Sequence, residues 1–153
     1  MSPDADTDDL ETETVDPTFA EEVISACRTT VGDELRSITY FDDEEEVEQL
    51  YLRSDLERTA DLIGFADHER LGFHSQSAYR NTQLGEYQAT IRMFENGFLN
   101  RVIRGGRGIW VTTDDMSIDR FEELTSALKA VIDEFNESEA AAEADDDESE
   151  REE

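Results

Sequence analysis

Several features are scarce in this 153-residue chain, and each scarcity excludes a class of protein. Cys27 is the only cysteine, so an internal disulfide is excluded. No apolar run reaches 18 residues, so the sequence predicts no membrane-spanning helix. The first 16 residues have neither a basic region nor an apolar region, which argues against a secretory signal peptide. Together these absences predict a cytoplasmic protein without a membrane partner.

Basic residues are also scarce, and lysine is almost absent. The chain has 13 basic and 41 acidic residues, a net charge of −28, and Lys129 is its only lysine. At about 1 M salt the Debye length falls to about 3 Å, so repulsion between exposed carboxylates is largely screened. The composition therefore predicts adaptation to concentrated salt. An acidic binder of basic proteins, such as a nucleic-acid mimic or a histone-type chaperone, is the open alternative.

The charge divides the chain into three parts. Residues 1–16 carry seven acidic residues and no basic one, and residues 137–153 carry ten acidic residues and one basic one. Both segments are polar and lack aromatic residues, so we expect two disordered acidic tails. The central residues 17–136 keep a net charge of −12 and are long enough for one domain with one core.

The first half of the central domain predicts a helix and a β-hairpin. Asp16-Pro17-Thr18 can begin a helix, since proline is tolerated in the first turn, and Gly32 is a suitable C-cap. Two short runs rich in β-branched and aromatic residues follow at 35–41 and 47–53, with an acidic turn between them. A second helix is expected from about 55 to about 70. Irregular chain is expected from Gly72 to Leu84. The apolar face of the first helix consists of Phe19, Val23, Ala26, Cys27 and Val31.

The second half predicts a three-stranded meander and a long helix. From Tyr87 to Met93 apolar and polar residues alternate strictly, which is typical of a strand. Asn96-Gly97 and the glycines of 105–108 provide the two turns, and the other strands are expected at 98–104 and 109–113. The last helix is expected to begin near 115–117 and to end near Asn136. Its apolar stripe consists of Ile118, Phe121, Leu124, Leu128, Val131, Ile132 and Phe135.

The predicted order is α-β-β-α-β-β-β-α, a single α+β domain with a five-stranded antiparallel sheet packed by helices. This order resembles the roadblock/dynein light chain domains, and more loosely the longin and profilin-like folds. The segments that carry the resemblance are 35–53, 55–70, 86–113 and 117–135. It implies a homodimeric, non-catalytic module that binds partner proteins, often in small-GTPase or motility switching. The acidic composition is also similar to that of small haloarchaeal proteins.

Metal-binding and catalytic patterns are weak. Cys27, His68 and His74 are the only soft ligands, and they lack the short paired spacing of a zinc site. Nothing in the sequence orients a histidine as the base for Cys27. The acidic run 42–46 lacks the alternating spacing and the glycine of an EF-hand loop, so we interpret it as a solvated turn. No metal or cofactor is expected.

The glycine-rich segment 105–108 has the composition of a phosphate-binding loop. A phosphate loop opens directly into a helix, but a strand is expected after Gly108. The segment therefore predicts a tight turn with a residue at positive φ.

Residues 80–112 are an exception to the acidic composition. They contain five arginines and two glutamates, a local net charge of +3. Contact with an anion or a nucleic acid is one interpretation, and pairing with neighbouring acidic residues or with a partner subunit is the other. The low overall pI and screening by salt disfavour nucleic acid. The candidate interaction surface consists of Arg80, Arg92, Arg101, Arg104, Arg107 and Trp110.

No convergent set of nucleophile, base and metal ligands is visible, so no enzyme is predicted. We expect a cytoplasmic interaction or regulatory module of a salt-adapted organism, acting as a homodimeric adaptor for an unidentified protein partner. Two alternatives stay open. One is a nucleic-acid-associated regulator that uses residues 80–107. The other is a small-ligand sensor, because a hydrophobic pocket leaves no sequence motif.

Overall fold

The computed structural model describes residues 15–44, 46–56, 69–75 and 82–152 of the chain. They form one mixed α/β domain in which most of the predicted elements are present. The helices and strands are α2 (Pro17–Val31), η1 (Gly32–Glu34), β1 (Leu35–Asp42), β2 (Val47–Leu52), α4 (Gly72–Ser75), β3 (Thr90–Phe94), β4 (Gly97–Arg104), β5 (Arg107–Thr113) and α5 (Ile118–Glu152).

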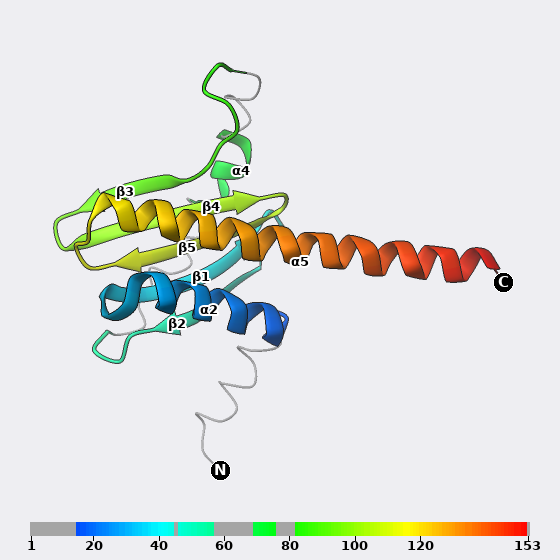
Figure 1. Ribbon diagram of the computed structural model, residues 1–153, viewed down its shortest axis with the longest axis horizontal. Helices are drawn as coiled ribbons and strands as arrows, with labels where there is room; N and C mark the ends of the chain where they lie inside the picture. Colours follow the sequence, from blue (N-terminus) through cyan, green and yellow to red (C-terminus); the bar gives the residue numbers. More distant parts are fainter. Residues whose placement is uncertain (1–14, 45, 57–68, 76–81, 153) are drawn as a thin grey trace, which may run out of the picture.

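The five strands form one antiparallel sheet with the order β2-β1-β5-β4-β3. The two hairpins therefore meet at β1 and β5, and β2 and β3 are the edges. Helices α2 and α5 pack against each other and lie side by side across one face of the sheet (Figure 1). This architecture confirms the predicted five-stranded antiparallel sheet packed by helices.

Local sequence explains both ends of α2. The Asp16 carboxylate accepts hydrogen bonds from the backbone N–H groups of Thr18 (2.8 Å) and Phe19 (3.2 Å), and Pro17 follows as the first helical residue. At the other end Gly32 has φ 74°, and its N–H donates to the carbonyl of Arg28. The predicted glycine cap is therefore confirmed.

The main core lies between the helices and the sheet. Helix α5 contributes four buried residues of its predicted stripe, whereas Ile118 at its start is 64% exposed. The ring of Phe19 stacks on that of Phe135, with centroids 4.3 Å apart. Burying one large apolar side chain stabilises the fold by about 1.5–3 kcal/mol, so this layer supplies most of the folding free energy. Its fully buried residues include Val23, Cys27, Ile38, Val102, Ile109, Val111, Leu124, Leu128 and Ile132.

The opposite face of the sheet carries a smaller apolar cluster of Phe41, Leu99, Ile103 and Trp110. Phe73 of α4 packs on it, with its ring centroid 5.5 Å from that of Phe41. The short helix α4 lies within the segment where irregular chain was expected. The second helix predicted at 55–70 falls, apart from its two ends, outside the described residues.

The first strand of the meander begins at Thr90 and not near Tyr87 as predicted. Residues 86–89 lack ladder partners in the register of β3 and β4. The Tyr87 hydroxyl instead donates to the carbonyl of Arg101 at 3.1 Å and lies 2.9 Å from Thr90 Oγ1. This side-chain bonding replaces the backbone pairing expected there.

Both boundaries of the domain differ from the prediction. Val15 lies in the segment expected to be disordered, yet it is 5% exposed and belongs to the core. At the other end α5 continues to Glu152, where a disordered tail was expected from residue 137, and its last turns extend past the sheet (Figure 1). Residues 137–152 contain no glycine or proline and many alanines and glutamates, which favour a helix.

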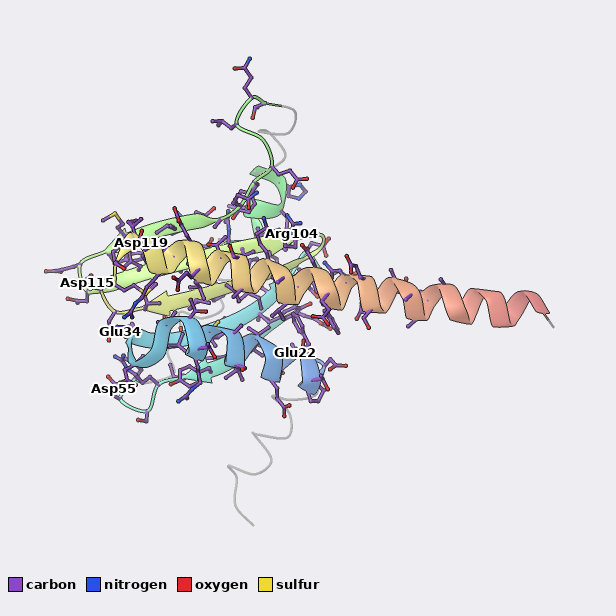
Figure 2. All side chains as sticks on the ribbon, in the orientation of Figure 1. Glu22, Glu34, Asp55, Arg104, Asp115 and Asp119 are labelled. Carbon is purple, nitrogen blue, oxygen red and sulfur yellow. The ribbon has the colours of Figure 1, made fainter. Side chains whose placement is uncertain are left out.

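The acidic residues are distributed over the whole domain. Figure 2 labels carboxylates on α2, on η1, after β2, before α5 and in its first turn, among them Glu22, Glu34, Asp55, Asp115 and Asp119. In the described parts of the chain, no helix combines the length and the apolar character needed to cross a membrane, α5 included.

Candidate functional site

The arginines of 80–112 lie on several surfaces, and those that the structure describes are paired with acidic or amide side chains. Arg80 lies outside the described residues. Arg92 and Arg101 both contact Glu69 on the sheet face opposite α2 and α5. The other two described arginines contact α5. The structure therefore supports the second interpretation of the sequence, pairing with neighbouring acidic residues.

Glu69 is the buried centre of this pairing. Its side chain is 3% exposed, and that of Arg101 is 6% exposed. Arg101 Nη1 donates to Glu69 Oε1 at 2.9 Å, and Arg92 Nε donates to Oε2 at 3.0 Å. Arg101 Nη2 also donates to Thr90 Oγ1 at 2.8 Å. A buried charge is tolerated only when its partners are in place, so this network fixes the segment at Glu69 over β3 and β4.

Two neighbours hold Arg101 in its buried position. A Cβ atom on Gly72 would clash with the Arg101 guanidinium, so glycine is needed for α4 to approach the sheet this closely. On the other side the Arg101 guanidinium carbon lies 5.9 Å from the centre of the Tyr87 ring, within cation–π distance. Arg101 is therefore part of the packing between α4 and β4.

Arg104 and Arg107 connect the sheet to α5. Arg104 makes a two-pronged contact with Asp133, at 2.9 Å from Nε and 3.0 Å from Nη2. Arg107 donates to Asn136 and Glu139, and its guanidinium carbon lies 4.8 Å from the ring centre of Phe135. Glu139 belongs to the segment expected to be a tail, so its first turn takes part in the domain.

Trp110 corrects the prediction of a surface residue. It is 1% exposed and belongs to the apolar cluster on the sheet face opposite α2 and α5. The reason is the strand order, which places β5 in the middle of the sheet between β1 and β4. The five described residues of the candidate surface therefore do not form one exposed surface.

The candidate metal ligands and the thiol have structural positions. No cluster of three or more metal-ligating side chains occurs in the described ranges. Cys27 is buried in α2, and burial raises the pKa of its thiol to about 12. His74 is exposed in α4, and His68 falls outside the described residues. A thiol with this pKa is protonated at neutral pH and is not an activated nucleophile.

Side chains hold the backbone of the acidic turn between Asp42 and Glu46. Asp42 Oδ1 accepts from the N–H groups of Glu44 and Glu46, both at 3.0 Å. Arg70 donates to the carbonyls of Asp42 (2.8 Å) and Glu46 (3.0 Å). Burial, followed by the neighbouring Asp42, raises the pKa of Glu46 above its ordinary value. These contacts make the turn a structural link between the first hairpin and Arg70.

The glycines of 105–108 form the tight turn that the sequence predicted. Gly105 has φ 64°, which favours glycine, and Arg104 pairs with Arg107 across the turn. Gly108 lies under the ring of Phe41, where a Cβ atom would clash. The glycines therefore serve the turn and the packing of the sheet.

A further ionic network joins the ends of β1, β2 and β5. Asp114 accepts hydrogen bonds from Arg53 Nη1 at 2.7 Å and from Arg36 Nη1 at 3.0 Å. The hydrogen bond from Arg53, followed by that from Arg36, lowers the pKa of Asp114 below its ordinary value of 3.8, although burial opposes the shift. Arg53 also contacts Asp55 at 2.6 Å.

The edge strand β3 is the exposed feature with the clearest binding character. Among the described strands, β3 pairs only with β4, so the backbone groups of its other side have no strand partner there. Met93 is 78% exposed, Phe94 61% and Ile91 40%. None of the large exposed hydrophobic residues of the described chain lies on the other edge, β2. An apolar strand edge is a template for pairing with another strand.

Sequence reasoning missed both Glu69 and the exposed edge. Glu69 sits next to the unassigned segment after residue 70, and nothing local distinguishes it from the other acidic residues. The alternation at Ile91 and Met93 correctly indicated a strand. Whether that strand is exposed depends on its position in the sheet, and the alternation of apolar and polar residues does not reveal that position.

Comparisons with known proteins place this geometry in a family. A family described as Domain of unknown function (DUF7522) matches residues 21–133. No curated protein matches the chain significantly. A solved structure described as MglB with a tetrameric arrangement is 12% identical, with a TM-score of 0.57 over 78% of this chain and 94% of that chain.

Two further structures show the same fold. MglB of Myxococcus xanthus is 9% identical, with a TM-score of 0.57 over 78% of this chain and 98% of its own. A Roadblock/LC7 domain from Streptomyces avermitilis is 15% identical, with a TM-score of 0.50 over 70% and 92% of the two chains. The roadblock-like fold predicted from the order of elements is therefore confirmed.

Proposed function

The chain belongs to the family described as Domain of unknown function (DUF7522), and on that premise we propose that it is a non-enzymatic regulatory or adaptor module whose β3 edge pairs with a second copy of itself. The proposal includes a cytoplasmic location and adaptation to concentrated salt. A further protein partner would bind the homodimer.

The observation that carries the proposal is the exposed apolar edge of β3. No described strand pairs with its outer side, and Met93 and Phe94 are more than half exposed. Monomeric proteins usually protect such an edge with charged residues, proline or a covering segment. Pairing with another strand would satisfy the backbone groups and bury the apolar side chains.

The charge distribution favours a second copy of the same chain at this edge. Two copies that each carry −28 repel one another unless they approach where negative charge is least. Strand β3 itself has no acidic residue, and its one charged residue, Arg92, is paired with Glu69. Concentrated salt screens the remaining repulsion. A related fold is also described with a tetrameric arrangement, which supports assembly as a use of this fold.

Size-exclusion chromatography with light scattering in about 2 M KCl tests the proposal. We expect a dimer for the natural chain and a monomer for Met93→Lys and Phe94→Lys, because a charge at the paired edge would be desolvated on association. Leu71→Lys is the matched control, since Leu71 is 61% exposed and lies outside β3. A natural chain that stays monomeric at micromolar concentration contradicts the proposal.

A further inference from the structure

Oxidisable sulfur is scarce in the chain and unevenly exposed. The sequence has one cysteine and three methionines. Met1 lies outside the described residues. Cys27 is fully buried in α2, and Met116, which precedes α5, packs against the main core. Met93 of the edge strand β3 is 78% exposed, so among the described residues it is the sulfur most accessible to an oxidant in solution.

Reactivity also favours Met93 over Cys27. A cysteine is oxidised through its thiolate, and burial raises the pKa of the Cys27 thiol to about 12. That thiol is therefore protonated at neutral pH and shielded from oxidants. A thioether has no proton to lose, so its oxidation depends on access to the sulfur. Exposure therefore selects Met93 as the site of oxidation.

Strand register places the Met93 side chain on the helix side of the sheet. Met93 lies directly opposite Phe98 in β4, and residues opposite one another share a face of the sheet. The ring of Phe98 packs edge-on against that of Phe121 in α5, with centroids 4.9 Å apart. Ile91, two residues before Met93, is on the same face and is 40% exposed. Met93 and Ile91 therefore form an exposed apolar pair on β3.

Pairing of two β3 strands would bring these side chains together, and the present inference rests on that proposed pairing. In an antiparallel pair centred on Arg92, the middle residue of β3, Met93 of one copy lies directly opposite Ile91 of the other. Opposed side chains have Cβ atoms about 4.5–5.5 Å apart, so they contact each other. The dimer would contain this contact twice, and each contact includes a Met93 thioether.

We propose that Met93 is a site of reversible oxidation by a peroxide and that its sulfoxide disfavours the pairing of two copies. The thioether sulfur attacks one oxygen of hydrogen peroxide, and the S–O bond forms as the O–O bond breaks. The sulfur loses two electrons, and the other oxygen leaves as water after it takes the proton of the transferred oxygen. The free subunit is the form that reacts, because its Met93 is exposed.

The sulfoxide changes the chemistry of the contact. Its oxygen is a hydrogen-bond acceptor, whereas the side chain that would face it, Ile91, is apolar. Pairing would remove water from the S=O group without replacing the lost hydrogen bonds. Because the dimer would carry two sulfoxides, we expect its dissociation constant to rise about 10- to 100-fold. Methionine sulfoxide reductases restore the thioether, one enzyme for each sulfoxide epimer, so the change is reversible.

Light scattering of the full chain in about 2 M KCl, before and after treatment with hydrogen peroxide, tests the proposal. Peptide mass spectrometry identifies which methionine has gained an oxygen. We expect Met93 to be modified before Met116, and the modified chain to show the weakened dimer. Treatment with both reductases and a dithiol, which supplies two electrons and becomes a disulfide, should restore the dimer.

Met93→Leu is the matched variant, because leucine keeps the apolar character and the approximate volume but cannot form a sulfoxide. It should form a dimer that peroxide does not dissociate. It also keeps Met1 and Met116, so it controls for oxidation elsewhere in the chain. Met116→Leu should respond to peroxide as the natural chain does.

The outcomes separate this inference from the proposed function. A natural chain that is monomeric before peroxide is added contradicts the pairing of β3 and, with it, this inference. A natural chain that forms a dimer and keeps it after Met93 has become a sulfoxide overturns this inference alone. Dissociation of the Met93→Leu dimer by peroxide also overturns it, because another residue would then be responsible.

Discussion

Arg101 shows how burial changes the role of a single residue. The sequence placed it in an arginine-rich candidate surface, but its side chain is 6% exposed and bonded to Glu69. Thr90 and Tyr87 complete its surroundings. At this position the positive charge organises the interior and is not available to an external anion.

Replacement of Arg101 by methionine should destabilise the domain by about 2–4 kcal/mol, because Glu69 would stay buried with Arg92 as its remaining charged partner. Urea unfolding in about 2 M KCl at one fixed protein concentration measures the free energy. Arg104→Met is the control. Its pair with Asp133 is partly exposed and should cost less than about 1 kcal/mol. Equal losses for the two variants would contradict the assigned role of Arg101.

Asp114 should make stability depend on pH in the acidic range. Its pKa is lower in the folded protein than the ordinary 3.8, chiefly because Arg53 donates a hydrogen bond to it. The unfolded chain then binds the proton more tightly, so this contribution is present above the unfolded pKa and is lost as the pH falls through the folded pKa. As the pH falls from about 5 to about 3, the free energy of unfolding should therefore decrease less for Asp114→Asn than for the natural chain. Parallel curves for the two proteins over that range would argue against this shift.

At the scale of elements, the sequence predicted what local pattern determines. The Asn96-Gly97 turn, the alternation at Ile91 and Met93 and the cap at Gly32 each depend on nearby residues, and each element is present. Strand order depends on contacts between distant segments. It places β5, which carries Trp110, in the middle of the sheet and β3 at its edge. Burial and the candidate site were therefore predicted less well than the elements.

The extension of α5 follows the same distinction. Helix propensity favours residues 137–152, but among the residues whose burial is described no core residue lies beyond Phe135. The last described contact of α5 with the sheet is the pair of Arg107 with Glu139. Propensity alone therefore explains the distal turns, whereas tertiary contacts end at Glu139.

Truncation of the chain after Ala140 should leave the thermal midpoint in about 2 M KCl within about 2 °C of the natural value, because the lost turns make no described contact with the sheet. Far-ultraviolet circular dichroism measures both the midpoint and the lost helical signal. A second truncation after Asn136 also removes Glu139 and should lower the midpoint further. A large loss on truncation after Ala140 would show that the distal turns stabilise the domain.

For the molecule as a whole, charge is the dominant property. The acidic residues occur on helices, turns and loops of the described chain, and Figure 2 labels examples on α2, on η1, after β2, before α5 and in its first turn. That distribution agrees with the proposed adaptation to salt better than with mimicry of a nucleic acid. Strand β3, which has no acidic residue, is then a favourable place for two copies to meet.

The thermal midpoint should rise with KCl concentration from about 0.2 to about 2 M, because screening removes repulsion among exposed carboxylates. A chain in which Glu21, Glu22, Glu122 and Glu123 are changed to glutamine should reach the same midpoint at lower KCl. These four side chains are exposed on α2 and α5. A midpoint that does not respond to KCl would rule out the salt adaptation.

The central claim is that two copies pair through β3, and a spin-label distance tests it most directly. A nitroxide on Glu95→Cys is selective, because Cys27 is buried and its thiol pKa is raised to about 12. In an antiparallel pair centred on Arg92, the two labelled positions lie six residues apart, about 20 Å at a strand rise of about 3.3 Å. We expect an inter-subunit distance of about 20–30 Å in about 2 M KCl, lost in the Met93→Lys background. The absence of a dipolar signal, or a distance beyond about 40 Å, would contradict pairing through β3.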